Sequence, residues 1–538
     1  MRCAPPPPTI GCRLSLDLDI FAGGGEVALS DVGAAMDAVR RADKPVIAYS
    51  SAYTDDSYQL AAHASEIWLN PLGTVLLRGP GGSNIYYKGL MDKLGITANV
   101  YRVGTYKAAV EPFTRSDMSP EARQAAQALG DSLWQSWVDE VHRVRPKAQV
   151  GDYIATAEAR LAQAGGDLAK TALEAGLVDR IGDRTDFGDR LAQLVGAKDK
   201  DVPGSFRTIP LDAWINSNPA SDDDGTIGVL TIAGDIVDGK AGNGTAGAET
   251  IVNRLNEGLK RGNLKALVVR IDSPGGSVLA SDRIRRAILH AKSKGLPVVI
   301  SMGSVAASGG YWVATTGDKI FAEPGTITGS IGVFGIVPSF QGTLAKLGLG
   351  ADGVKATPLS GEPDPLRGPS AEAGRLIQAT VEDIYRRFVG LVADARRLPP
   401  ERVEAIAEGR VWAGGTAHQL GLVDSFGSLD DAVAEAARRA HIAPQRARAV
   451  FLERKPGILE SMLTSAAGDN SQAEPDALTR LAAQPRLTLA RAFEDAQRLL
   501  DGPVLQARCL ECGPAAPDPQ PQGRSRSTLP ALLALLSR

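Results

Sequence analysis

Ser308 has the surroundings of a nucleophile. The β-branched stretch Val298–Ser301 runs into small residues, and Ser308 is then followed directly by two glycines and an apolar run. This pattern places a serine on a sharp turn at a helix N-terminus, where glycines let another backbone approach. The N–H groups of the first helical turn point toward whatever the serine attacks. An ordinary glycine-rich strand-to-helix turn explains this stretch equally well.

A second glycine turn could stabilise a negatively charged oxygen. Asp272-Ser-Pro-Gly-Gly276-Ser ends another apolar strand. Its glycines can present backbone N–H groups to a developing oxyanion, with the N–H group of Gly309 as the second donor. A simple strand-ending turn is the alternative, but the combination with Ser308-Gly-Gly favours the functional interpretation.

A serine hydroxyl is a poor nucleophile unless a base removes its proton. The chain has five histidines, which are His63, His142, His290, His418 and His441. None of them lies in a glycine-framed or strand-end motif, and no Gly-x-Ser-x-Gly motif surrounds Ser308. A Ser-His-Asp triad therefore has no support in the sequence, although the sequence does not exclude it.

Lysine is the other candidate base, provided that burial keeps it neutral, because an unperturbed lysine has a pKa of about 10.4. Lys107 is the only basic residue in the glycine-led apolar segment Gly104–Phe113. A lysine that only snorkels beside a strand is the alternative, and sequence reasoning alone favours it. Lys355, in Gly353-Val-Lys-Ala-Thr-Pro, is a competing base.

Alternating strands and helices must position these residues. Strand-like runs such as Leu14–Ile20 alternate with helical patterns such as Val32–Val39, which predicts an α/β fold with largely parallel pairing. The same order of strand-like and helical segments recurs after roughly 245–253 residues. The matching pairs are Leu14–Gly25 with Leu267–Gly276, Lys44–Ile47 with Leu296–Ile300, Ile67–Pro71 with Ile320–Pro324, and Ala175–Gly182 with Leu420–Gly427.

The repeat predicts two tandem α/β domains that differ at one position. Aligning Tyr58 with Tyr311 puts Asp55 at the position of Ser308, so only the second copy carries the nucleophile. The predicted organisation is a disordered leader (1–12), a first copy (13–197), a linker (198–224), a second copy (225–448) and a helical or disordered tail (449–538). The first copy has no counterpart of the strand Thr226–Val237 and is therefore expected to be clipped at its N-terminus.

Composition narrows the class of protein. The 538 residues are 43% hydrophobic and 22% charged with a net charge of −3, so nothing points to a nucleic-acid partner. No run reaches the roughly 18 apolar residues of a transmembrane helix.

The four cysteines lie at the ends, as Cys3, Cys12, Cys509 and Cys512. Cys509 and Cys512 have the spacing of half a zinc site, but without a second pair a tail disulfide or free thiols are favoured.

Four motifs together indicate a family: Asp272–Ser277, Ala306–Trp312, Thr328–Gly335 and Tyr101–Phe113. They closely resemble those of the signal peptide peptidase A family, also called protease IV, in its long tandem-domain bacterial form, and the resemblance runs from about Arg13 to Arg448. It implies a crotonase/Clp-protease-like fold for both copies and a serine endopeptidase with a Ser/Lys dyad. It implies no cofactor or metal.

The resemblance also implies roles for individual residues. Ser308 from the second copy would be the nucleophile and Lys107 from the first copy, rather than Lys355, the general base. Ser330 would orient the lysine, and Gly276 and Gly309 would hold the oxyanion of the acyl-transfer reaction. The dyad would therefore lie at the seam between the copies, and neither copy would be active alone.

The resemblance further implies substrates, assembly and location. The expected substrates are cleaved signal peptides and other short apolar peptides, and the expected assembly is a homotetramer. The expected location is the periplasmic face of the bacterial inner membrane. Residues 1–12 do not resemble the family's N-terminal membrane anchor, so membrane association rests on the resemblance alone.

Two rival functions belong to other classes. A crotonase-type acyl-CoA hydratase, isomerase or hydrolase would use the same glycine-framed oxyanion hole for a thioester enolate. Such sites usually supply acidic bases, whereas here the central position is a serine followed by two glycines. The second rival is a non-catalytic scaffold, a role that the first copy without its serine must partly have.

Overall fold

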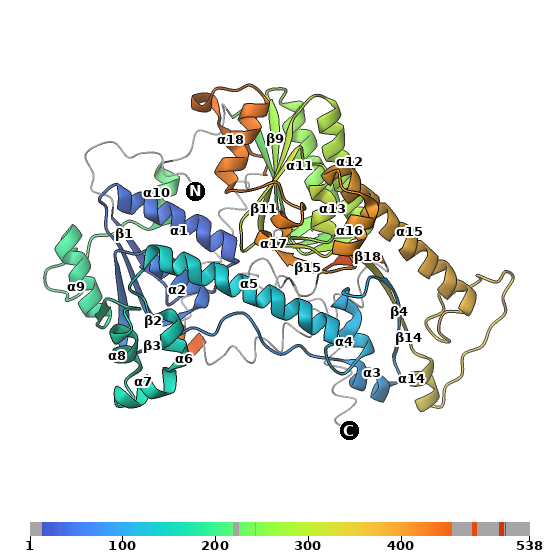
Figure 1. The fold of residues 1–538 in the computed structure, drawn as a ribbon, viewed down its shortest axis with the longest axis horizontal. Coiled ribbons are helices and arrows are strands. Elements are labelled where there is room, and N and C mark those ends of the chain that lie inside the picture. The colour runs from blue at the N-terminus through green and yellow to red at the C-terminus, as the bar shows by residue number, and fades with distance from the viewer. Residues whose placement is uncertain are drawn as a thin grey trace.

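The two copies that the sequence predicts each form a sheet covered by helices (Figure 1). The structure is a computed structural model, and it describes residues 13–218, 225–242, 244–453, 476–480, 505–509 and 512. The predicted leader and much of the predicted tail lie outside these residues.

The first sheet is parallel throughout and has the strand order β1-β2-β3-β5. Buried Val, Ile, Ala and Tyr side chains fill β2, which lies in the middle of the sheet. The strands are β1 (Leu14–Asp17), β2 (Val46–Thr54), β3 (Glu66–Leu76) and β5 (Arg180–Ile181). The helices of this copy are α1 (Glu26–Arg41), α2 (Asp55–Ala62), α5 (Pro120–Val144), α6 (Val150–Ala155), α7 (Ala157–Gln163), α8 (Leu168–Glu174) and α9 (Arg184–Val195).

The second sheet has the order β15-β13-β11-β9-β6-β17, and β12 and β16 pair beside β11. It is parallel except where β13 meets β15. Its strands are β6 (Ile227–Ala233), β9 (Ala266–Ser273), β11 (Val298–Ala307), β12 (Lys319–Ala322), β13 (Ile327–Gly329), β15 (Val411–Ala413), β16 (Ser425–Phe426) and β17 (Ala449–Phe451). Its helices are α11 (Ala248–Lys260), α12 (Val278–Ser293), α13 (Gly309–Ala314), α15 (Ala371–Arg396), α16 (Pro400–Ile406), α17 (Gly414–Gln419) and α18 (Leu429–Arg439).

Equivalent side chains make equivalent contacts in the two copies. The hydroxyl of Tyr58 donates to the carbonyl of Leu177 at 2.8 Å, and that of Tyr311 donates to the carbonyl of Leu422 at 2.7 Å. Both tyrosines lie in the short helix that follows the central strand of their sheet. The prediction of an α/β fold built from a repeat is therefore confirmed. Within the described residues, the first copy has no counterpart of β6.

A third, mixed sheet joins the copies in the order β4-β14-β18-β10-β7-β8. Strand β4 belongs to the first copy and pairs antiparallel with β14 of the second, from Val103 opposite Val333 to Thr97 opposite Ser339. The strands are β4 (Thr97–Val103), β7 (Asp235–Val237), β8 (Thr245–Gly247), β10 (Gly275–Ser277), β14 (Val333–Ser339) and β18 (Leu505–Arg508). Three short helices lie near β4 and β14: α3 (Lys88–Leu94), α4 (Glu111–Thr114) and α14 (Gln341–Lys346).

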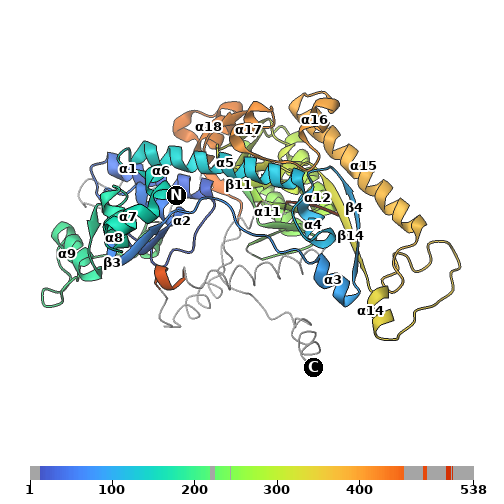
Figure 2. The same ribbon diagram turned by 60° about the horizontal axis from the view of Figure 1, so that its bottom comes forward.

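The long helix α5 also connects the copies. It packs on α2 of the first copy and reaches β15 of the second, and both Figure 1 and Figure 2 show it running from one copy to the other. Lys107 lies between β4 and α5 in the chain, so its segment is anchored to the second copy on both sides.

The predicted linker (198–224) and tail (449–538) contain more regular secondary structure than the sequence predicts. The predicted linker includes α10 (Leu211–Ser217), and the predicted tail contributes β17 to the second sheet and β18 to the third. Both strands are short and are held by pairing with strands distant in the sequence, which local residue patterns do not reveal.

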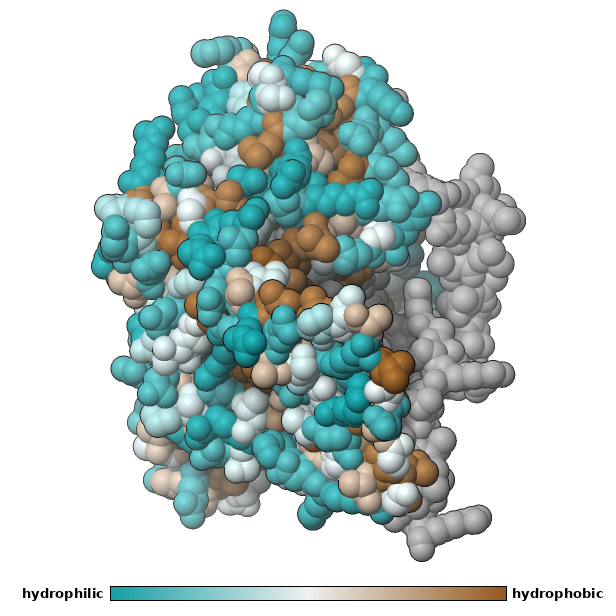
Figure 3. All heavy atoms as spheres, turned by 90° about the vertical axis from the view of Figure 1, so that its right-hand side faces the viewer, coloured by the Kyte–Doolittle hydropathy of each residue, from teal (hydrophilic) through white to brown (hydrophobic). Residues whose placement is uncertain are grey.

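The surface carries both hydrophilic and apolar side chains. Apolar side chains gather near the middle of the face in Figure 3, surrounded by hydrophilic ones. Exposed apolar residues also lie in the segment between α14 and α15, including Leu347, Leu349 and Val354. Among the helices of the described residues, none has the length and apolar character needed to cross a membrane.

Candidate active site

Ser308 lies on a strained turn between β11 and α13. Its φ of 54° and ψ of −113° form a combination that residues other than glycine rarely adopt, at a cost of about 1–3 kcal/mol. Two backbone hydrogen bonds hold the turn: the Ser308 N–H donates to Gly329 O at 2.8 Å, and the Trp312 N–H donates to Ser308 O at 2.9 Å. The sequence prediction of a serine on a strand-to-helix turn is therefore correct in its geometry.

Lys107 reaches Ser308 because of the register between β4 and β14. Val103 ends β4 opposite Val333 at the start of β14. In an antiparallel pair, residues after the end of one strand lie near those before the start of the other. Lys107, four residues after Val103, is thereby carried to Ser330, three residues before Val333.

The amine of Lys107 lies between two serine hydroxyls. Its Nζ is 3.0 Å from Ser308 Oγ and 2.9 Å from Ser330 Oγ, and it donates to the Ser330 carbonyl at 3.3 Å. Lys107 is 1% exposed, and both serines are 0% exposed. The ring of Phe334 lies 5.9 Å from Nζ. The structure therefore brings the two predicted dyad residues, Ser308 and Lys107, and the predicted orienting residue Ser330 into one buried cluster.

A glycine lets the Lys107 backbone approach the second copy closely. A Cβ atom on Gly409, whose φ is +80°, would lie 2.7 Å from the Cα of Lys107. The Gly409 N–H donates to Ile331 O at 2.9 Å, and the Ser330 N–H donates to Arg410 O at 2.7 Å. The loop around Gly409 therefore packs against both the lysine segment and the Ser330 turn.

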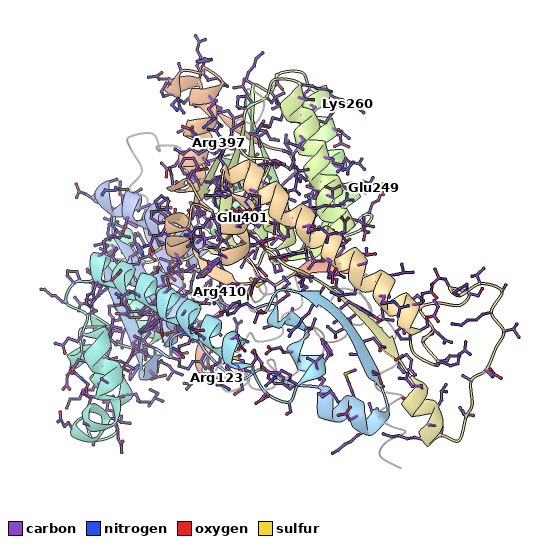
Figure 4. The ribbon with its side chains drawn as sticks, turned by 45° about the vertical axis from the view of Figure 1, so that its right-hand side comes forward. Arg123, Glu249, Lys260, Arg397, Glu401 and Arg410 are labelled. Atoms are coloured by element: carbon purple, nitrogen blue, oxygen red, sulfur yellow. A yellow bond between two sulfur atoms is a disulfide. The ribbon has the colours of Figure 1, made fainter. Side chains whose placement is uncertain are left out.

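Arg410 packs against the aromatic ring of Tyr106, the residue next to Lys107, and against that of Trp412. Its guanidinium lies 3.7 Å from the ring centroid of Tyr106 and 5.1 Å from that of Trp412. Figure 4 places Arg410 near the centre of the molecule, whereas Glu249 and Lys260 lie on α11 in an outer region. Sequence reasoning missed Gly409 and Arg410, which lie outside the recognised motifs. Tyr106, next to Lys107, was the one available signal.

The two predicted glycine turns meet beside Ser308. A Cβ atom on Gly275 would lie 2.6 Å from the Gly309 nitrogen, and one on Gly276 would lie 2.1 Å from Ile236 O. Both positions have positive φ, +95° and +152° respectively, so side chains are excluded here by space and by conformation. Gly276 and Gly309 are thus near each other, as an oxyanion site requires.

Asp272 supports the strand that carries Ser308. The register between β9 and β11 shifts between Met302 and Ala306, and the carboxylate of Asp272 accepts a hydrogen bond from the Val305 N–H there at 2.9 Å. Burial raises the pKa of Asp272 to about 6, partly opposed by this hydrogen bond and by the charge of Arg270. Its position indicates a structural role.

The other candidate bases lie elsewhere. Within the described part of the chain, no histidine is hydrogen-bonded to Ser308; His63, for example, is buried between Asp37 and Glu140. Lys355 forms an ion pair with Glu362 at 2.5 Å. The described residues also hold no group of three or more potential metal ligands, and Cys509 and Cys512 form a disulfide.

Asp55 has a structural role at the position equivalent to Ser308. It begins α2, directly after the central strand of the first sheet. Its Oδ1 accepts hydrogen bonds from the N–H groups of Arg78 at 3.0 Å and Gly79 at 3.1 Å. The carboxylate therefore ties the start of α2 to the backbone at Arg78 and Gly79.

Comparison with known proteins places the chain in a family. The model of peptidase family S49 matches residues 38–198 and 290–443. Protease 4 of Salmonella typhi is 37% identical over 512 residues, which are 92% of this chain and 80% of that protein. Protease 4 of Haemophilus influenzae is 38% identical over 437 residues, covering 79% and 69%. The chloroplastic serine protease SPPA of Arabidopsis thaliana is 31% identical over 415 residues, covering 75% and 59%. The chain therefore belongs to peptidase family S49 and is a serine peptidase.

Proposed function

We propose that the protein is an endopeptidase in which Ser308 is the nucleophile and Lys107 the general base. The distance of 3.0 Å between Lys107 Nζ and Ser308 Oγ, in a cluster closed to solvent, carries this proposal. It lies within the range that proton transfer between a nucleophile and its base needs. A lysine acts as a base only in its neutral form, which burial favours.

The chemistry is acyl transfer. As the Ser308 hydroxyl attacks a peptide carbonyl, its proton passes to the neutral amine of Lys107. The resulting ammonium protonates the leaving amine, and water then hydrolyses the acyl-enzyme. Ser330, 2.9 Å from the same amine, orients it toward Ser308.

The oxyanion of the tetrahedral intermediate is stabilised by backbone N–H groups of Gly276 and Gly309. These glycines lie on turns that touch beside Ser308, and fixed donors of this kind act strongly in a site that excludes water. The strained backbone of Ser308 supports the same assignment, because strained conformations cluster at active sites.

We infer further that the substrates are cleaved signal peptides and other short apolar peptides, and that both copies have a crotonase/Clp-protease-like fold. A relative from Enterococcus faecium that is 36% identical over 170 residues is named a putative signal peptide peptidase. The buried, largely uncharged surroundings of Ser308 suit apolar peptides.

Assembly and location are part of the same proposal. We infer a homo-oligomer, a tetramer by resemblance, that acts at the periplasmic face of the inner membrane. The exposed apolar residues Leu347, Leu349 and Val354 are a candidate contact surface. Light scattering on the purified protein would test the oligomer, and a monomer at micromolar concentration would contradict it.

Substitution of the nucleophile tests the function. We expect Ser308→Ala to abolish hydrolysis of a short apolar peptide, whereas a neighbouring serine outside the cluster, Ser301→Ala, leaves it within a few fold. Hydrolysis that survives Ser308→Ala would refute the assignment. Tight coenzyme A binding without peptide hydrolysis would instead favour the crotonase-type acyl-CoA alternative, for which the comparisons give no support.

A further inference from the structure

Strand β18 lies beside the candidate active site, between two strands that flank it. It is inserted in the third sheet between β10, which carries the glycines of the oxyanion site, and β14, which follows Ser330. Ala507 pairs with Gly276 and Gln506 with Ser277 on one side, and Gln506 pairs with Phe334 on the other. Both pairings are antiparallel. Extended peptides bind to sheet edges through the same kind of main-chain pairing.

The carbonyl of Ala507 lies close to Gly275 and Gly309. A Cβ atom placed on Gly275 would lie 2.1 Å from Ala507 O, and one placed on Gly309 would lie 3.1 Å from the same oxygen. The Ala507 carbonyl oxygen therefore lies against the two turns assigned to the oxyanion. Ala507 itself is 0% exposed, so this position accepts only a small side chain.

The residues after Ala507 fasten the strand in place. Arg508 forms an ion pair with Asp235 of β7 at 3.1 Å, and the Cys509 N–H donates to Pro274 O at 2.8 Å. The disulfide between Cys509 and Cys512 is buried. It packs in an apolar cluster with Val305 and Ala307 of β11, Val411 and Ala413 of β15, and Leu129 of α5.

We propose that Leu505–Cys509, together with Cys512, is an intramolecular inhibitor that occupies the peptide slot, and that the Cys509–Cys512 disulfide latches it there. The proposal rests on the proposed function, since it assigns the occupant of that same site. A substrate takes the slot between β10 and β14 only when this segment leaves, with a small residue at the position of Ala507. The occupant belongs to the same chain, so it competes at an effective concentration of the order of millimolar.

Release of the latch is a thiol–disulfide exchange. A dithiol reductant attacks the Cys509–Cys512 bond and forms a mixed disulfide, and its second thiol then displaces the remaining protein sulfur. The products are two protein thiols and the cyclic disulfide of the reductant. Without the bond, Cys512 in the apolar cluster no longer holds Cys509 at the end of the strand, and the strand leaves its slot more readily.

Two full-length variants test the proposal with different perturbations. Ala507→Asp puts a charge where no space exists, and Cys509→Ser/Cys512→Ser removes the latch. The matched control is Cys3→Ser/Cys12→Ser, which changes the other two cysteines. We expect both test variants to lower the KM for a short apolar peptide by at least about tenfold relative to the wild type and the control, because the internal competitor is weakened. Dithiothreitol should do the same to the wild type and to the control.

A binding measurement separates this proposal from the proposed function. In the Ser308→Ala background, where nothing is cut, a fluorescent peptide with the sequence Val-Leu-Gln-Ala-Arg should bind about tenfold more tightly once Ala507→Asp is added. Equal binding and equal KM in all variants, with hydrolysis still dependent on Ser308, would overturn the inhibitor and leave the peptidase intact. Hydrolysis independent of Ser308 would overturn the proposed function, whereas tighter peptide binding would still support the occupied slot.

Discussion

Replacing Lys107 by methionine separates the chemical role of its amine from its contribution to packing. Methionine keeps most of the length and volume of the buried side chain but cannot accept a proton. In the wild type, Nζ lies 3.0 Å from Ser308 Oγ and 2.9 Å from Ser330 Oγ. The substitution removes both contacts without opening a large cavity.

The expected loss of activity follows from the role of a general base. Positioned acid–base groups contribute about 10²–10⁴-fold to rate, which corresponds to about 3–5 kcal/mol of transition-state stabilisation. We therefore expect kcat/KM to fall by about that factor. Stability should change little, because each lost hydrogen bond is worth about 0.5–1.5 kcal/mol and the cost of burying an amine disappears with it.

Initial rates on a short apolar peptide and thermal unfolding of the same preparations measure the two effects. The matched control is Lys355→Met, which changes the competing lysine of the second copy, paired with Glu362 away from the site. It should retain wild-type kcat/KM. A Lys107→Met enzyme that is correctly folded and within threefold of wild type would refute the role of Lys107 as base.

Three further predictions concern the orienting serine, the pH dependence of hydrolysis and the buried carboxyl group of Glu26. Ser330→Ala should lower kcat/KM by about 10–100-fold, since it removes one hydrogen bond to the buried amine, whereas a change below twofold would argue against the orienting role. Peptide hydrolysis should fall at acid pH, where a protonated lysine cannot act as a base, and a flat rate down to about pH 4 would contradict this. Burial and, secondarily, the charges of Glu140 and Asp56 raise the pKa of Glu26 to about 8. The native state then holds a proton that the unfolded chain has lost, so this group's contribution to stability declines as pH rises from about 4.3 to 8. Glu26→Gln should therefore raise Tm relative to wild type at pH 8.5 and not at pH 4.5, as calorimetry can show; an equal shift at both would refute the assignment.

Much of the fold could be predicted because its signals are local. Apolar runs marked the central strands β2 and β11, and the repeat of Tyr58 at Tyr311 showed that one unit occurs twice. The sharp turn at Ser308 could also be predicted, because two glycines, Gly309 and Gly310, follow directly and allow such a turn. The apolar runs and the glycine turn each lie within a short stretch of sequence, and the repeat is found by comparing two such stretches.

The assembly of the site depends on pairings that no local pattern encodes. Strand β4 leaves its own copy and pairs with β14, and only this register carries Lys107 to Ser330. From residue types alone, a snorkelling lysine is the favoured interpretation of Lys107, and only the family resemblance favours the general base. The packing of Gly409 and Arg410 around the lysine segment could not be predicted for the same reason.

Strand β18 is the clearest example of a structure that the sequence alone does not predict. Residues Leu505–Arg508 were expected to belong to a helical or disordered tail, because four residues carry too little periodicity to indicate a strand. Their position is fixed by partners on both sides, at Gly276 and at Phe334, that are distant in the sequence. The disulfide was left open as one of several states of Cys509 and Cys512, and the structure shows the bond formed.

The most direct test of the dyad is the rate at which Ser308 becomes acylated. Wild-type protein and Lys107→Met would be treated with an activated ester of a short apolar peptide, and the modified residue would be located by mass spectrometry over time. We expect a single acyl adduct on Ser308 that forms at least about 100-fold more slowly in Lys107→Met. An adduct on another residue, or equal rates of acylation in the two proteins, would contradict it.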